Sequence, residues 1–139
     1  MSTLVPCGAG DTDADSYTGG CDCDDANPQV WGTPGDVRDL VLYKDALDGP
    51  TLGWSAPLNP GGAVTVYDAI RTSDPSDFVT AATCLPAPDP SSLTRADSQD
   101  PEPDGVFCHL VRATNACPAG SGPLGASSSG ARRAGRTCP

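Results

Sequence analysis

The sequence predicts an all-β protein: an antiparallel β-sandwich preceded by an irregular acidic segment. The 139 residues include 16 glycines and 15 prolines, which argues against long helices. From Asp36 onward, short alternating apolar and polar runs are separated by turn residues about every ten positions, as in sandwiches. The net charge of −10 is concentrated near the start, where residues 1–25 contain no Lys, Arg or His. We therefore divide the chain into an acidic segment (1–28), a hinge (29–35) and a sandwich (36–139).

The acidic segment contains a twelve-residue pattern that is typical of a calcium loop. Aspartates occupy its first, third and fifth positions, and another closes it at position twelve. Calcium prefers about six to eight oxygen ligands, and position seven of such loops supplies a backbone carbonyl. A bound cation would also relieve the repulsion among the carboxylates. A solvated acidic linker is the alternative. The predicted Ca²⁺ ligands are Asp11, Asp13, Asp15, the carbonyl of Tyr17, and Asp22.

The loop departs from helix-flanked calcium loops at three positions. Ser16 replaces the turn glycine, Asp22 is one methylene shorter than the usual Glu, and Cys21 precedes the closing carboxylate. With its prolines, glycines and cysteines, the stretch 7–28 resembles one aspartate-rich repeat of the thrombospondin type 3 family. That resemblance implies calcium ions held along an irregular chain, with disulfides as staples.

Seven strands are expected in the remaining chain. The best defined is 106–113, in which Phe107, His109, Val111 and Ala113 share one face. The last predicted strand, 125–138, is poor in side chains that can pack and needs a partner strand to hold it. The predicted strands cover residues 37–44, 51–55, 63–71, 78–84, 92–96, 106–113 and 125–138.

Three stretches in this order, 52–57, 67–71 and 107–115, resemble the B, C and F strands of a fibronectin type III domain. The resemblance covers residues 36–138 and implies a seven-stranded sandwich with Trp54 and Tyr67 in its core. His109 stands where the family usually has a tyrosine, and the cysteines are foreign to most eukaryotic members. An acidic calcium segment joined to such a domain resembles secreted multidomain proteins of bacteria.

The seven cysteines favour disulfides over zinc, because the chain has no paired Cys-x-x-Cys clusters and a single histidine. Disulfides and calcium both indicate an extracellular location. A hairpin of the last two strands, centred near Pro123, would bring the cysteines of those strands together. This hairpin predicts Cys108–Cys138. The fourth strand should end near the end of strand 106–113, which predicts Cys84–Cys117. Cys7 would then pair with either Cys21 or Cys23, with one thiol left over.

Other features of the sequence argue against nucleic-acid binding, a membrane span and catalysis. The acidic chain lacks a basic stripe for nucleic acid and the run of about 20 apolar residues that a membrane span needs. No glycine-framed nucleophile is present, and a satisfied core histidine is the better interpretation of His109 than a catalytic base. Stretches 90–94 and 127–129 are candidate sites for O-linked glycans. We expect a non-enzymatic protein.

The expected role is structural: a calcium-stabilised extracellular module that builds an adhesive or filamentous cell-surface assembly. Residues 2–6 form a short β-prone run with no domain of their own. We expect them to dock beside a sandwich edge of the next copy, which gives a homo-oligomer or filament through head-to-tail contacts. The alternative is a carbohydrate-binding accessory module of a secreted enzyme.

Overall fold

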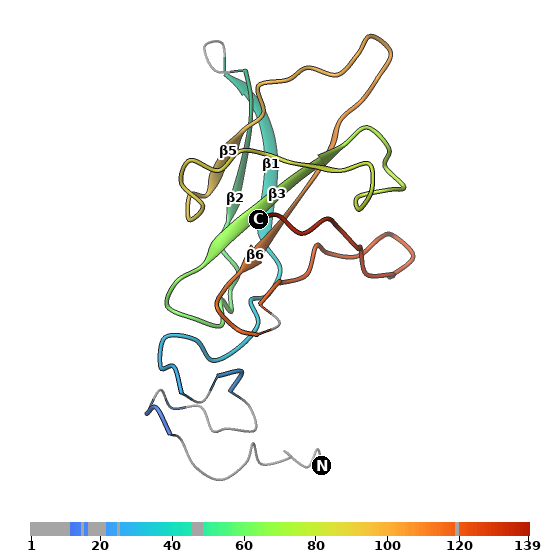
Figure 1. The fold of residues 1–139 in the computed structure, drawn as a ribbon. Coiled ribbons are helices and arrows are strands. Elements are labelled where there is room, and N and C mark those ends of the chain that lie inside the picture. The colour runs from blue at the N-terminus through green and yellow to red at the C-terminus, as the bar shows by residue number, and fades with distance from the viewer. Residues whose placement is uncertain (1–11, 15, 17–21, 25, 46–48, 119) are drawn as a thin grey trace.

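The computed structural model describes residues 12–14, 16, 22–24, 26–45, 49–118 and 120–139, and in these residues the fold is all-β (Figure 1). Two antiparallel three-stranded sheets have the orders β1-β2-β5 and β4-β3-β6. This confirms the predicted class. The described residues contain no helix that could span a membrane. The strands are β1 (Arg38–Asp45), β2 (Gly49–Ser55), β3 (Val66–Thr72), β4 (Thr83–Cys84), β5 (Thr94–Ala96) and β6 (Cys108–Thr114).

The first sheet is built on the β1–β2 pair, close to the predicted strands 37–44 and 51–55. From Val41 onward the register is regular, with Val41 opposite Gly53 and Leu42 opposite Leu52. Before that point the ladder is irregular, and Asp39 has a φ of 56°, in the left-handed region. The irregularity is a β-bulge, which interrupts pairing at the start of β1.

The second sheet is built on β3 and β6, which pair from Val66 opposite Thr114 to Thr72 opposite Cys108. The predicted strand 78–84 is wrong for most of its length, because only Thr83–Cys84 is β-structure. The cause is Asp77, whose carboxylate accepts hydrogen bonds from the amides of residues 79, 80 and 81. These bonds satisfy the amides within a turn, so they are not available to a β-ladder.

The core between the sheets contains the two aromatic residues expected there. Trp54 on β2 and Tyr67 on β3 are buried, and their ring centroids lie 5.5 Å apart in an edge-to-face arrangement. Leu52 from the first sheet and Ala69 and Val111 from the second complete the contact. Burial of these apolar side chains is the main force that holds the two layers together.

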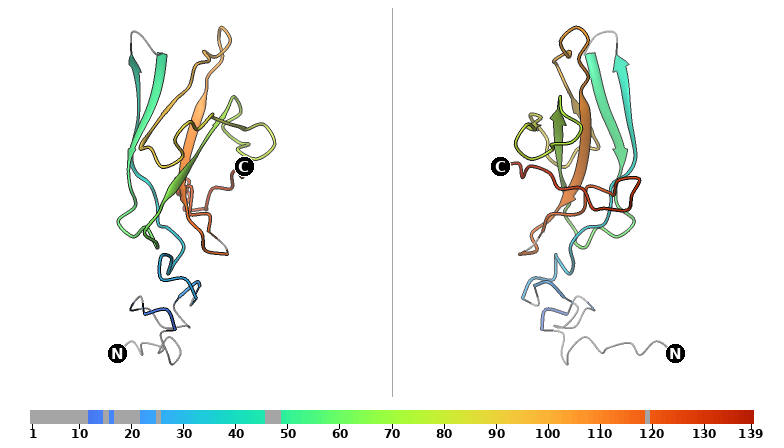
Figure 2. Two further views of the ribbon diagram at one scale, coloured as in Figure 1. Left: turned by 60° about the vertical axis from the view of Figure 1, so that its left-hand side comes forward. Right: turned by 90° about the vertical axis from the view of Figure 1, so that its right-hand side faces the viewer.

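The outer face of β4-β3-β6 is covered by residues 123–138, which we call the C-terminal strap. The strap lies on the side of β3 and β6 that faces away from β1 and β2 (Figure 2, left). Leu124 packs with Ile70 and Leu110 there. The predicted strand 125–138 is therefore wrong: this glycine-, serine- and alanine-rich stretch forms one isolated bridge, between residues 126 and 132. Because this stretch has few large side chains that could pack along a strand, it covers the face of the sheet and does not form a β-ladder.

The path of the strap corrects two predicted disulfides. Cys138 bonds to Cys84, with Cα atoms 5.8 Å apart, because the strap crosses the sheet towards β4 instead of pairing with β6. The predicted Cys108–Cys138 and Cys84–Cys117 bonds are both wrong. Cys108 is a free thiol. Cys23 is bonded to Cys117, so the predicted alternative Cys7–Cys23 is also wrong. Cys7 and Cys21 lie outside the described residues, and Cys7–Cys21 stays a prediction.

Candidate functional site

The predicted hinge, residues 29–35, is fastened to the β2–β3 loop of the sandwich. It runs alongside residues 59–63, and four backbone hydrogen bonds of 2.8–2.9 Å join the two stretches. Val30 forms a bridge with Gly62 and is almost fully buried. Gly61, with a φ of 69°, approaches so closely that a Cβ atom would collide with the carbonyl of Gly32. A glycine is therefore required at this position.

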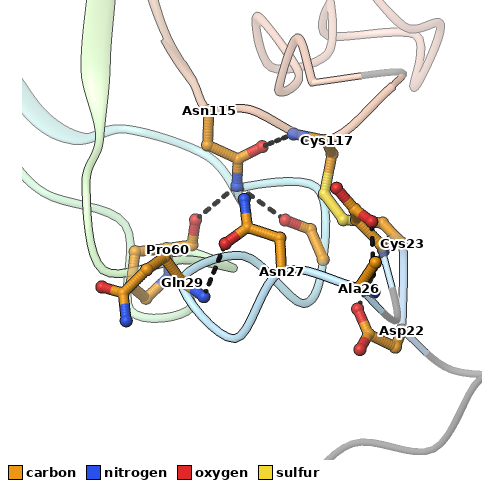
Figure 3. Close-up of a disulfide and its surroundings, with 10 residues drawn as sticks. Asp22, Cys23, Ala26, Asn27, Gln29, Pro60, Asn115 and Cys117 are labelled. Atoms are coloured by element: carbon orange, nitrogen blue, oxygen red, sulfur yellow. Dashed lines mark hydrogen bonds between the residues drawn. A yellow bond between two sulfur atoms is a disulfide. The ribbon is translucent and has the colours of Figure 1, made fainter. Parts of the chain in front are cut away.

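Asn115 and Cys117, just after β6, attach this junction to the second sheet (Figure 3). The Asn115 Nδ2 donates hydrogen bonds to the carbonyls of Gly32 (2.7 Å) and Pro60 (3.1 Å). Its Oδ1 accepts one from the amide of Cys117 at 3.0 Å. Cys117 is in turn disulfide-bonded to Cys23, with Cα atoms 5.6 Å apart. One amide side chain thus connects the hinge, the β2–β3 loop and the disulfide.

Sequence reasoning missed both the role of Asn115 and the partner of Cys117. The available signal was local. An asparagine side chain often accepts a hydrogen bond from the backbone amide two residues later, and Asn115 accepts one from the amide of Cys117 in this way. The long-range half of the arrangement has no sequence signature. Cys23 and Cys117 are 94 residues apart, so only the folded chain brings them together.

The predicted calcium loop is described in part. Asp13 and Asp22 are half-buried, and the other predicted ligands, Asp11, Asp15 and Tyr17, lie outside the described residues. Ser16, at the turn position of the loop, has a φ of 78°, the left-handed conformation that glycine usually provides. The described backbone therefore makes a turn at the position where a calcium loop needs one.

The carboxylates of Asp13 and Asp22 test whether the described residues suit a cation. One oxygen of Asp22 accepts a hydrogen bond from the amide of Asp24 at 2.9 Å. Its other oxygen, Oδ2, is enclosed and has no hydrogen-bond partner in the described part of the chain. Asp13 Oδ2 is also enclosed. An enclosed carboxylate oxygen needs a donor or a cation, so Asp22 fits the predicted role. The described residues alone contain no cluster of three or more potential metal ligands.

A second polar cluster joins the two sheets near the other end of the sandwich. Asp97, which follows β5, is 2% exposed and bonds to Arg71 on β3 and to Nε2 of His109 on β6, the latter at 2.8 Å. Arg71 also lies over the ring of Phe107, 4.4 Å from its centroid. The environment of His109 agrees with the predicted satisfied core histidine, because its ring is engaged in an inter-sheet contact.

A cavity of about 480 Å³ lies beside β3 and is lined partly by Tyr67, Asp68 and Arg95. Arg95 is buried and donates to the Tyr67 carbonyl at 3.2 Å, while its Nε has no partner in the described part of the chain. The indole nitrogen of Trp54 is likewise enclosed without one. Burial lowers the pKa of Arg95, against the raising effect of the carboxylates of Asp68 and Asp89.

No protein-family model and no curated protein matches this chain. The resemblances to thrombospondin type 3 repeats and fibronectin type III domains therefore remain predictions from the residues that carry them.

Proposed function

We propose that this protein is a secreted structural module, in which a calcium-stiffened acidic segment is fixed to a fibronectin type III-like sandwich. Copies of the module build an adhesive or filamentous cell-surface assembly, in which the segment sets the angle between neighbours. The proposed role is non-enzymatic, and secretion accounts for the disulfides.

One observation carries this proposal: the Cys23–Cys117 disulfide joins the acidic segment to the sandwich covalently. A flexible acidic linker would need no such bond. Cys23 directly follows Asp22, the last predicted calcium ligand, and Cys117 lies two residues from Asn115. Rigidity gained in the loop is therefore passed to the sandwich through one disulfide and the Asn115 hydrogen bonds.

Asp11, Asp13, Asp15 and Asp22 would hold the calcium ion, together with the Tyr17 carbonyl. The ion would neutralise carboxylates that otherwise repel one another and would cross-link the loop. The enclosed Oδ2 of Asp22 supports this assignment.

The strand arrangement supports the fibronectin type III-like part of the proposal. The stretches that resemble its B, C and F strands fall on β2, β3 and β6. In immunoglobulin-like sandwiches the B strand lies in one sheet and the C and F strands lie in the other. The same division is observed here, where β2 belongs to the first sheet and β3 pairs with β6 in the second.

Calorimetric titration of the whole chain with calcium tests this function. We expect the Asp13→Ala variant to bind calcium about tenfold more weakly than the wild type, or worse, because it loses a ligand. Asp100→Ala, which removes an exposed aspartate far along the sequence, is the matched control and should bind as the wild type does. Equal affinity in all three proteins, or no calcium binding in the wild type, would refute the calcium site.

The cavity beside β3 favours a second candidate, a carbohydrate-binding accessory module. It combines apolar walls with the polar groups of Asp68 and Arg95, a mixture typical of small-molecule sites. Trp54 lies beside Arg95, whose guanidinium carbon is 5.9 Å from its ring centroid. A set of soluble oligosaccharides that leaves the tryptophan fluorescence unchanged would count against this candidate.

A further inference from the structure

The four sheet edges in the described part of the chain differ in their capacity to accept another strand. β4 and β5 contain two and three residues, which is too short for a ladder of useful length. β6 is buried from Leu110 to Ala113, and its end is already paired, since Gly122 donates to the Ala113 carbonyl at 2.8 Å. β1 contains eight residues, and among the described residues β2 is its only neighbour in the sheet.

β1 is also the most apolar exposed part of the described chain. Four consecutive side chains, Leu40, Val41, Leu42 and Tyr43, are 39%, 53%, 56% and 47% exposed. Successive side chains of a strand point to opposite faces, so apolar surface is exposed on both sides of the sheet at this edge. Soluble proteins normally protect such edges with charges, prolines or a covering segment. The charged residues of β1 lie at its two ends, and the apolar residues 40–43 between them remain exposed. An exposed apolar stretch of this kind indicates a binding surface.

We propose that β1 is the acceptor edge for residues 2–6 of a second copy of this chain. This inference rests on the proposed assembly and names its contact surface. Residues 2–6 read Ser-Thr-Leu-Val-Pro, which provides apolar side chains for both faces of the extended sheet. Pro6 has no amide hydrogen, so the added ladder ends there, before the cysteine and glycine residues that follow.

The bulge in β1 sets the length of the contact. Pairing between β1 and β2 is irregular from Arg38 to Val41 and regular from Val41 to Asp45. A bulge re-aims backbone groups and ends regular pairing, so an incoming strand would use the regular part. That part contains as many residues as the stretch 2–6. The added strand would cover Val41, Leu42 and Tyr43, three of the four exposed apolar residues.

Charge explains why this surface suits another copy of the chain. Each copy carries a net charge of −10, so most contacts between copies bring acidic surfaces together. β1 is different because its two cations, Arg38 and Lys44, balance its two anions, Asp39 and Asp45. Residues 2–6 are uncharged. The proposed contact therefore joins two stretches that carry no net charge, so it adds little repulsion between copies.

Sedimentation of the full chain over a range of concentrations, in calcium, is the first test. We expect the wild type to associate and Leu42→Lys to associate about tenfold more weakly, since a charge is placed within the added ladder. The matched control is Leu58→Lys, because Leu58 is also exposed but lies in the β2–β3 loop. Both positions are solvent-accessible, so both variants should fold. Association of Leu42→Lys equal to that of the wild type would overturn the proposal while leaving the calcium-stiffened module intact.

Titration of the isotope-labelled full chain with a synthetic peptide of residues 1–6 identifies the occupant. We expect amide shifts in residues 41–45 by nuclear magnetic resonance, and none of similar size in β5 or β6. Loss of association in Leu42→Lys without these shifts would mean that β1 pairs with some other segment, which contradicts the proposal. A wild-type chain that stays monomeric at every concentration would also contradict it. Failure of the calcium titration alone would refute only the proposed metal site.

Discussion

The two sheets of this protein are protected to very different degrees. β4-β3-β6 is covered on both faces, by the first sheet on one side and by the C-terminal strap on the other. β1-β2-β5 is covered on one face by the second sheet. Its longer edge strand, β1, nevertheless exposes apolar side chains on both of its own faces. The same chain therefore covers both faces of one sheet and leaves an apolar edge strand of the other exposed. The difference shows that the exposed edge is a local feature of β1 and not a general weakness of the fold.

The cover on the second sheet is held by polar contacts as well as apolar ones. Arg112 on β6 forms an ion pair with Asp68 at 3.1 Å and donates a hydrogen bond to the carbonyl of Arg136 in the strap. Arg136 donates in turn to the carbonyl of Ala82 at 2.7 Å. These bonds compensate for the small side chains of the strap, which bury little apolar area of their own.

The largest expected effect comes from removing the covalent end of the strap. The double variant Cys84→Ser/Cys138→Ser should lose about 4 kcal/mol of stability, because the disulfide closes a loop with a sequence separation of 54. Cys108→Ser is the control, since that thiol is free and should matter little. Chemical denaturation measures both. Equal stability of the double variant and the wild type would show that the strap needs no covalent anchor.

A smaller effect separates the covered sheet from the exposed edge. Ile70→Ala should lower the free energy of unfolding by about 3 kcal/mol, because the Ile70 side chain of β3 is fully buried beneath the strap. Leu42→Ala removes a side chain of the same size from the exposed edge and should cost less than about 0.5 kcal/mol. Denaturant unfolding at low protein concentration keeps association out of the comparison. Similar losses in both variants would mean that β1 is buried in the monomer.

The smallest effect concerns the Asp77 turn beside the strap. Hydrogen bonds from backbone amides hold the pKa of Asp77 below its ordinary value of 3.8. A depressed pKa contributes stability above the ordinary value, and this contribution is lost as the pH falls through the folded pKa. Asp77→Ala should therefore melt slightly lower than the wild type at neutral pH, and the two should converge as the pH falls through the folded pKa, which lies below 3.8.

Thermal melting across this pH range provides the measurement, with Asp100→Ala as an exposed control. Phe78, next to Asp77, packs against the apolar cluster that contains Ile70 and Leu124. Its carbonyl accepts a hydrogen bond from the amide of Arg136 at 2.7 Å. The same turn therefore supports the covered face. A gap between wild type and Asp77→Ala that does not narrow as the pH falls below 3.8 would contradict the assigned cause.

Local pattern was enough for the strands that alternate clearly. The predicted strands 37–44, 51–55 and 106–113 match β1, β2 and β6 within two residues at each end. The fibronectin type III resemblance implies that Trp54 and Tyr67 lie in the core, and both are buried there. Pattern failed at 78–84, where the side chain of Asp77 competes for the backbone, and at 125–138, where few side chains can pack.

What the sequence by itself determined about this protein is therefore its class, most of its strands, and the acidic character of its first segment. These follow from local alternation, turn residues and charge, which act over a few neighbouring positions. Only the tertiary structure decided that Cys138 bonds to Cys84 and Cys117 to Cys23, and that Asn115 connects the hinge to the β2–β3 loop. Such pairings depend on where distant segments meet in space, and no local pattern encodes that meeting.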